Sequence, residues 1–119
     1  MKAGIIGATG YAGAELVRIL SNHPKIDELI LSSVSFEGEK IADVYPNFLG
    51  SITSSLVKAE DVLAAADVVF TALPHGVGEQ YAMNCISRRI PFIDLSADFR
   101  FGDDEAAFSA WYGMPYKHP

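Results

Sequence analysis

The sequence predicts an α/β fold with a doubly wound parallel sheet, and three features support this prediction. Several short runs are almost wholly apolar, as strands are when helices cover both faces of a parallel sheet. Segments with helical spacing alternate with these runs, which is the order of elements in a doubly wound sheet. The length of 119 residues suits one domain and is short for two.

Four apolar runs have the length and composition of buried parallel strands. They occupy residues 3–6, 29–31, 68–73 and 90–95, and Pro91 interrupts the last one. Ligands of open α/β sheets lie at the carboxyl ends of strands, near the point where the strand order reverses. We expect the run at 68–73 to lie beside the run at 3–6 across that point.

Segments with helical spacing lie between these runs and predict helices, and charged residues at the ends support two of them. Glu60 and Asp61 stand at the start of one, and Arg88 and Arg89 at the end of another. Asp103 or Asp104 would cap a further helix. The expected helices are residues 11–22, 59–66, 77–88 and 103–112.

The first expected helix has an apolar stripe made of Ala12, Leu16, Ile19 and Leu20, which predicts the side that packs on the sheet. The proline at position 24 stops this helix.

The stretch 33–55 is less regular and predicts a long loop with a helical turn near 41–44. A long irregular connection of this kind inside a compact domain more often has a function than serves only to join two elements.

Charge and composition exclude several classes of partner. Nine basic residues against fifteen acidic ones give a formal charge of −6, so nucleic acid is not expected as the main partner. No apolar run approaches the roughly 20 residues that span a bilayer, and the start of the chain predicts a strand rather than a signal peptide. The single cysteine fits a reducing compartment and excludes a cysteine-built metal cluster. We therefore expect no membrane partner, no metal site and a cytoplasmic location.

A glycine-rich segment, Gly-Ala-Thr-Gly-Tyr-Ala-Gly at residues 7–13, joins the first strand to the first helix. In this place it indicates a dinucleotide site of the Rossmann type. The first glycine would allow the tight turn, the second the approach of a diphosphate, and the third close packing of the helix. The amides of roughly residues 10–12 would face the phosphate; the alternative is a purely structural role for the glycines. The cofactor-binding candidates are Gly7, Thr9, Gly10, Tyr11, Ala12 and Gly13.

The end of the second strand favours NADP over NAD. An NAD site usually has Asp or Glu at this tip, about 20 residues past the glycines, whereas this chain has Ser32 and Ser33 there. Hydroxyls can donate to a 2′-phosphate, and the missing carboxylate removes a repulsion. Lys40, in the following loop, is a candidate for the positive partner. A solvated serine-rich turn is the alternative.

Two further clusters follow the later strands. Leu73, Pro74 and His75 would face the nicotinamide half of the cofactor, or the histidine only caps a turn.

In the second cluster, Ser96, Asp98 and Arg100 could reach the same crevice. Ser96 is a cofactor candidate, and Asp98 and Arg100 are candidates for an anionic substrate group. A structural ion pair between Asp98 and Arg100 is the alternative.

With these clusters in place, the sequence resembles the N-acetyl-gamma-glutamyl-phosphate reductase family of arginine biosynthesis. The resemblance covers the whole chain, and Leu-Ser-Ala-Asp-Phe-Arg is its most specific part. The matching motifs are Gly-Ala-Thr-Gly-Tyr-Ala-Gly (7–13), Val-Tyr-Pro (44–46), Ala-Leu-Pro-His-Gly (72–76), Asp-Leu-Ser-Ala-Asp-Phe-Arg (94–100) and Trp-Tyr-Gly (111–113).

The resemblance implies a reductive dephosphorylation. In that family a cysteine attacks an acyl phosphate, phosphate leaves, and NADPH reduces the thioester to N-acetylglutamate semialdehyde. The family's nucleophile lies in an Asn-Pro-Gly-Cys-Tyr motif that does not occur here. Cys85 falls on the inward stripe of an expected helix, which predicts an inert core thiol and not the nucleophile.

No catalytic residue is therefore expected in this chain. The resemblance implies that residues 1–119 form the NAD(P)-binding Rossmann domain of a larger two-domain enzyme. It further implies a small-molecule substrate, a homo-oligomeric full-length enzyme, and no reductase activity of the 119-residue chain alone.

Two rival interpretations remain open. Aspartate-semialdehyde dehydrogenase and aminoadipyl-phosphate reductase share fold, cofactor and thiol chemistry with the family above. A non-catalytic NADP sensor on an extended short-chain dehydrogenase fold also opens with Gly-Ala-Thr-Gly-Tyr. No tyrosine here is followed four residues later by lysine, which excludes an active short-chain reductase within the segment but not a sensor.

Overall fold

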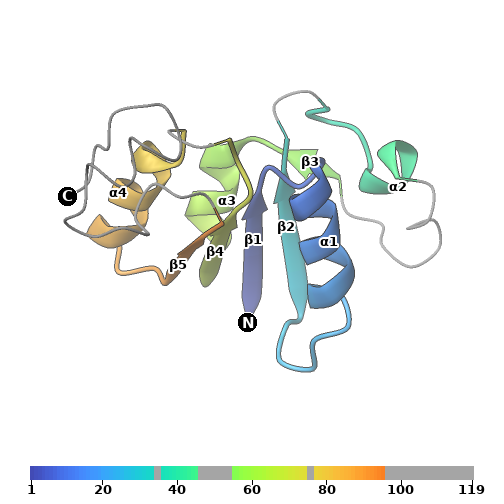
Figure 1. Ribbon diagram of the computed structural model, residues 1–119. Coiled ribbons are helices and arrows are strands. Elements are labelled where there is room, and N and C mark those ends of the chain that lie inside the picture. The colour runs from blue at the N-terminus through green and yellow to red at the C-terminus, as the bar shows by residue number, and fades with distance from the viewer. Residues whose placement is uncertain (34–35, 46–54, 75–76, 96–119) are drawn as a thin grey trace, which may run out of the picture.

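A computed structural model describes residues 1–33, 36–45, 55–74 and 77–95 of the chain. They form a sheet of five strands in the order β3-β2-β1-β4-β5, and every neighbouring pair is parallel. Helices lie on both faces of this sheet (Figure 1). The predicted doubly wound α/β fold is therefore confirmed.

The predicted strands and helices that fall on described residues are present, with small shifts at their ends. The helix expected at 103–112 lies outside the described residues. The elements are β1 (Lys2–Ile6), α1 (Tyr11–Leu20), β2 (Glu28–Ser32), α2 (Ile41–Val44), β3 (Leu56–Val57), α3 (Ala59–Ala65), β4 (Val68–Thr71), α4 (Glu79–Ser87) and β5 (Phe92–Asp94).

One strand was not predicted. The two-residue β3 pairs with the end of β2, with Leu31 opposite Leu56 and Ser32 opposite Val57. Two residues are too few to show a period, so tertiary pairing alone defines this strand.

The strand order reverses beside β1, as predicted. From β1 the chain builds outward through β2 and β3, then returns to place β4 on the other side of β1. Ile6 of β1 lies opposite Ser32 in β2 and opposite Thr71 in β4. The carboxyl ends of the strands thus meet at one edge of the sheet, which is where ligands of such sheets bind.

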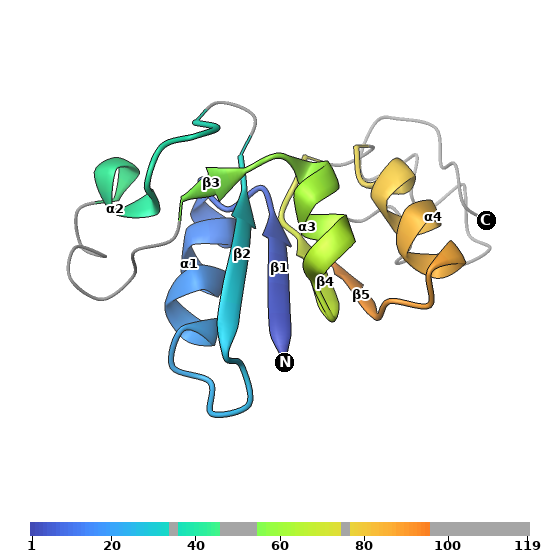
Figure 2. The ribbon, with the colours of Figure 1, turned by 180° about the vertical axis from the view of Figure 1, so that it is seen from behind.

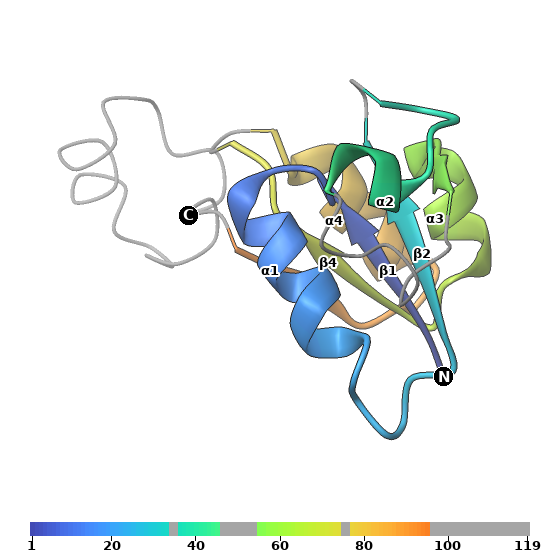
Figure 3. The same ribbon diagram turned by 90° about the vertical axis from the view of Figure 1, so that its right-hand side faces the viewer.

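Successive residues of β1 face two separate hydrophobic cores. Ile5 packs with Val17 of α1, Leu31 of β2 and residues of α2, whereas Ile6 packs with residues of α3 and α4. Figure 1 shows α1 in front of the sheet, and Figure 2, seen from behind, brings α3 to the front. Figure 3 shows the same layers from the side.

The predicted inward stripe of α1 is wrong in part. The buried residues are Gly13, Val17 and Leu20, whereas Ile19 is 53% exposed and Ala12 faces solvent. The cause is Gly13, whose missing side chain lets the helix approach the turn after β1. The helix face that carries Gly13, Val17 and Leu20 therefore packs inward, and Ile19 lies on a different face.

Cys85 is confirmed as a buried core residue. It has no exposed surface and packs with Val62 and Val69 in the core beneath α3 and α4. Burial raises the pKa of its thiol, and the nearby Arg88 offsets this only in part. A raised pKa keeps the thiol protonated at neutral pH, so the reactive thiolate is scarce.

We therefore expect iodoacetamide to alkylate native Cys85 far more slowly than the same thiol in urea. Mass spectrometry over time measures both rates. Cys85→Ala should lower the free energy of unfolding by about 1 kcal/mol, through lost packing. Rapid alkylation of the native chain at neutral pH would contradict the assignment.

Candidate functional site

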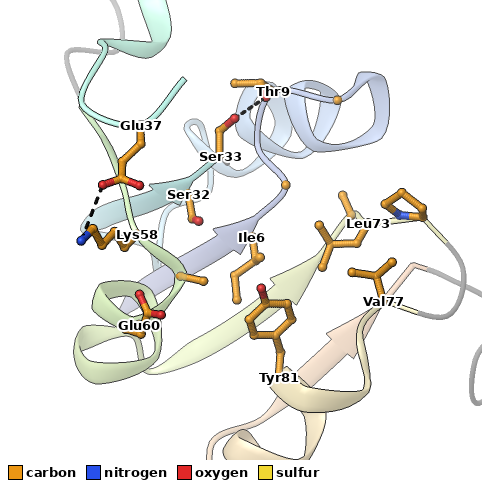
Figure 4. A pocket seen from close by; sticks show the side chains of 15 residues that line it. Ile6, Thr9, Ser32, Ser33, Glu37, Lys58, Glu60, Leu73, Val77 and Tyr81 are labelled. Atoms are coloured by element: carbon orange, nitrogen blue, oxygen red, sulfur yellow. Dashed lines mark hydrogen bonds and ion pairs between the residues drawn. The ribbon is translucent and has the colours of Figure 1, made fainter. Parts of the chain in front are cut away.

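A pocket of about 740 Å³ lies at the carboxyl edge of the sheet, a volume typical of small-ligand sites. It opens where β1, β2, β3 and β4 end and where α1 begins (Figure 4). The lining residues are Ile6, Gly7, Thr9, Gly10, Ser32, Ser33, Glu37, Lys58, Ala59, Glu60, Ala72, Leu73, Pro74, Val77 and Tyr81.

Two of the motif's glycines are required by the fold itself. Gly7 has φ +91°, and a Cβ there would lie 2.5 Å from the carbonyl oxygen of Ala72. A Cβ on Gly13 would lie 2.0 Å from the carbonyl oxygen of Gly7. Side chains cannot occupy such positions. Glycine at position 7 therefore allows the tight turn, and glycine at position 13 allows α1 to pack closely against that turn.

Gly10 differs, because the fold does not require a glycine there. Its backbone has φ −74° and ψ 169°, which any residue adopts. A Cβ on Gly10 would meet only the Gly7 carbonyl oxygen, at 3.7 Å. The space beside Gly10 therefore belongs to the pocket, and a side chain would fill it.

The start of α1 presents backbone donors near this space. The first intrahelical bond runs from the Ala14 amide to the Gly10 carbonyl at 2.8 Å, and the amides before it have no acceptor within a helix. Among the described residues, none accepts from the amides of Tyr11, Ala12 or Gly13. The Gly10 amide donates to Gly7 at 3.3 Å, so the available amides lie one residue later than predicted.

The electrostatics of this helix start favour an anion. The first turn of α1 carries no acidic residue, and no side chain caps it. By contrast, the first turn of α3 carries Glu60 and Asp61. The positive end of the α1 dipole is therefore not neutralised by its own sequence.

Several hydrogen bonds hold the glycine turn to the end of β2. The carbonyl of Ser32 accepts from the amides of Gly7 and Ala8 at 3.1 and 3.0 Å. The hydroxyls of Thr9 and Ser33 are 2.7 Å apart and share a hydrogen bond (Figure 4). The hydroxyl of Tyr45 donates to the carbonyl of Thr9. The turn, β2 and the segment after α2 thus form one connected unit.

The end of the pocket near β2 and β3 carries charge that the sequence analysis missed. Lys58 Nζ lies 4.0 Å from Glu37 Oε1, and both residues line the pocket (Figure 4). Lys40, the candidate from sequence, is exposed and does not line the pocket. Lys58 could have been found only by its position at the end of a strand, and the strand before it, β3, is too short to predict from sequence.

The opposite end of the pocket is mostly apolar. Leu73, Val77 and Tyr81 lie across from Lys58 in Figure 4, and Pro74 completes this end. Leu73 and Pro74 therefore lie where the sequence placed them, at the end of β4. His75 lies outside the described residues, and so do Ser96, Asp98 and Arg100.

Some of the predicted cofactor residues line the pocket and others do not. Gly7, Thr9, Gly10, Ser32 and Ser33 line it. Tyr11 does not line the pocket and is 95% exposed, and its backbone amide lies at the start of α1.

Comparison with known proteins identifies the family. The family model "Semialdehyde dehydrogenase, NAD binding domain" matches residues 2–119. The chain belongs to this family.

Curated relatives of this chain include N-acetyl-gamma-glutamyl-phosphate reductases. A Clostridium beijerinckii N-acetyl-gamma-glutamyl-phosphate reductase is 47% identical over 119 residues, all of this chain and 34% of the relative. An Azotobacter vinelandii protein of the same name is 43% identical over 121 residues, all of this chain and 35% of the relative. The resemblance drawn from the motifs is thus confirmed, and the chain spans about a third of these relatives.

Solved structures of aspartate semialdehyde dehydrogenases share the fold. The Candida albicans protein, solved with NADP, has a TM-score of 0.66 at 21% identity, over 99% of this chain and 40% of that one. The Vibrio cholerae enzyme II has a TM-score of 0.70 at 21% identity, over 87% of this chain and 30% of that one.

Two features are absent from the described residues. No three His, Cys, Asp or Glu side chains gather there as a metal site requires. In the same residues no helix has the length and apolar character needed to cross a membrane.

A glycine-to-alanine series separates glycines needed by the fold from one needed by the pocket. We expect Gly7→Ala and Gly13→Ala each to lower the free energy of unfolding by about 2 kcal/mol or more, through a clash with backbone. Gly10→Ala should cost below about 1 kcal/mol, the helix-cap preference alone. Urea unfolding followed by circular dichroism gives all three values, and equal losses would refute the distinction.

Proposed function

We propose that this chain is the NADP(H)-binding part of an N-acetyl-gamma-glutamyl-phosphate reductase. The observation that carries the proposal is its 47% identity, over its full length, to a relative of that name. Because the chain spans 34% of that relative, the proposal assigns cofactor binding to residues 1–119. It assigns the covalent chemistry to a further domain.

The pocket supports this proposal on physical grounds. The open space beside Gly10, the amides of Tyr11 to Gly13 and the absence of acid in the first turn of α1 all suit a diphosphate. The turn from Gly7 to Gly13 would hold the diphosphate. Ser32 and Ser33 would contact the adenosine ribose, and Leu73 and Pro74 the nicotinamide half.

Bound NADPH would supply the hydride that reduces an acyl group to an aldehyde. The residues of this chain would bind and orient the nucleotide, and Leu73, Val77 and Tyr81 would give its nicotinamide half an apolar surface. Cys85 takes no part, because it is buried and burial raises its pKa. The nucleophilic cysteine therefore belongs, in this proposal, to the further domain.

The proposal extends to the substrate and the setting of the enzyme. His75 and Ser96 would contact the cofactor, and Asp98 and Arg100 would contact a small anionic substrate. The full-length enzyme would be a homo-oligomer in the cytoplasm. The single free cysteine fits the reducing cytoplasm.

The aspartate enzymes are the alternative from the same family. Their structures resemble this chain with only 21% sequence identity, so the likeness concerns the fold alone. The substrate assignment follows instead the identity of 42–47% to the curated relatives.

An assay of the reverse reaction tests the substrate. The full-length protein that carries this chain should form NADPH from NADP⁺, phosphate and N-acetylglutamate semialdehyde, which absorbance measures directly. The 119-residue chain alone should show no turnover. Faster turnover with aspartate semialdehyde would transfer the assignment to the aspartate enzymes, and no turnover with either would refute the proposal.

Gly10→Ala tests the cofactor part independently. We expect it to weaken NADPH binding about tenfold or more, because the added methyl group occupies the space of the diphosphate. Isothermal titration calorimetry measures the affinity, and a melting curve close to that of the parent shows that the fold is kept. Unchanged NADPH affinity in a folded variant would refute the placement of the diphosphate.

A further inference from the structure

We propose that Lys58 binds the 2′-phosphate of NADP(H), and that Glu37 limits the preference for this phosphate by competing for the same ammonium group. The inference rests on the proposed function, because it assumes that a dinucleotide occupies the pocket. It concerns specificity, which neither the family nor the glycine motif determines.

Lys58 is the one cationic side chain among the described residues that line the pocket. Two carboxylates, Glu37 and Glu60, line the same space, so the side chains of the pocket carry a net negative charge. A ligand with an additional phosphate needs a compensating cation there. Within the described part of the chain, Lys58 meets that need.

The sheet places Lys58 beside the residues that the ribose would contact. Val57, immediately before it, pairs with Ser32 at the end of β2, and the adenosine ribose of a Rossmann site lies at this strand end. Ser32 and Ser33 line the pocket next to Lys58 (Figure 4). Two hydroxyls and one ammonium group thus line one pocket, and each of these groups can donate to a phosphate.

The contact with Glu37 leaves Lys58 available. The distance of 4.0 Å between Nζ and Oε1 exceeds the range of a direct hydrogen bond. Both side chains are well exposed, Lys58 at 63% and Glu37 at 47%, and exposed ion pairs of this kind are weak. A phosphate with a charge near −2 would therefore replace the carboxylate as the partner of Lys58.

Glu37 then acts against the phosphate. Glu37 lines the same pocket as Lys58, so its negative charge repels an incoming dianion. The alternative role for Glu37 is to accept from the ribose hydroxyls, as an acidic residue does in NAD sites. Figure 4 shows its carboxylate directed toward Lys58, which favours the competing role.

The test compares 2′,5′-ADP with 5′-AMP, which differ only in the 2′-phosphate, by titration calorimetry on the purified protein. Lys58→Met keeps most of the apolar stem and removes the charge. We expect it to weaken 2′,5′-ADP binding about tenfold and to change 5′-AMP binding by less than about twofold. Glu37→Gln should strengthen 2′,5′-ADP binding about threefold and leave 5′-AMP unchanged.

Two lysine variants complete the design. Lys40→Met tests the residue that the sequence suggested, and Lys25→Met is a matched control in the exposed loop before β2, at the opposite end of that strand. Neither should change either affinity. Added salt should weaken 2′,5′-ADP binding less in Lys58→Met than in the parent, because one attraction is gone.

Each other outcome overturns the inference in a recognisable way. Equal weakening of both ligands by Lys58→Met, or no weakening, would remove Lys58 from the phosphate. Weaker 2′,5′-ADP binding in Lys40→Met alone would assign the 2′-phosphate to Lys40. Weaker 5′-AMP binding in Glu37→Gln would assign Glu37 to the ribose. If the parent protein binds 2′,5′-ADP and NADPH, only this inference fails in these cases; if it binds neither, the proposed function fails as well.

Discussion

The close approach of α1 to the turn after β1 is the constraint on which the rest of the structure depends. Gly13 lies so near the carbonyl of Gly7 that no side chain fits between them. This contact sets the rotation of α1, which buries Val17 and Leu20 against the sheet. It also sets where the first amides of the helix point. A packing requirement in the core and the geometry of the pocket therefore share one cause.

That arrangement explains how an acidic chain can suit an anion. A formal charge of −6 disfavours anions at long range, although ions in solution screen this repulsion beyond about 10 Å. At short range the backbone provides the attraction, through the amides of Tyr11, Ala12 and Gly13. Amide donors and a helix dipole are fixed by the fold and need no net positive charge. The side chains are then free to determine which nucleotide is preferred.

The sequence predicted the layers, the strands β1, β2, β4 and β5, and the glycine turn, because each has a local signature. It could not predict β3, since two residues have no period, nor the rotation of α1, since Ile19 is as apolar as Val17. It also assigned NADP preference from the tip of β2, where Ser32 and Ser33 show no carboxylate. In the structure, however, a carboxylate from the following loop, that of Glu37, lines the pocket. Glu37 follows Ser33 by only four residues, but the path of an irregular loop has no periodic signal that would place its side chain at the pocket.

The position of Lys58 is itself a consequence of core packing. Leu56 is buried among Ile5 and Leu31 on the α1 side, and Val57 packs on the opposite face. Because side chains alternate along a strand, a shift of one residue would exchange these faces and bury a polar neighbour. Leu56 therefore fixes the register of β3, and with it the point at which the chain leaves the sheet. The one cation that lines the described pocket is thus positioned by an apolar residue that does not line it.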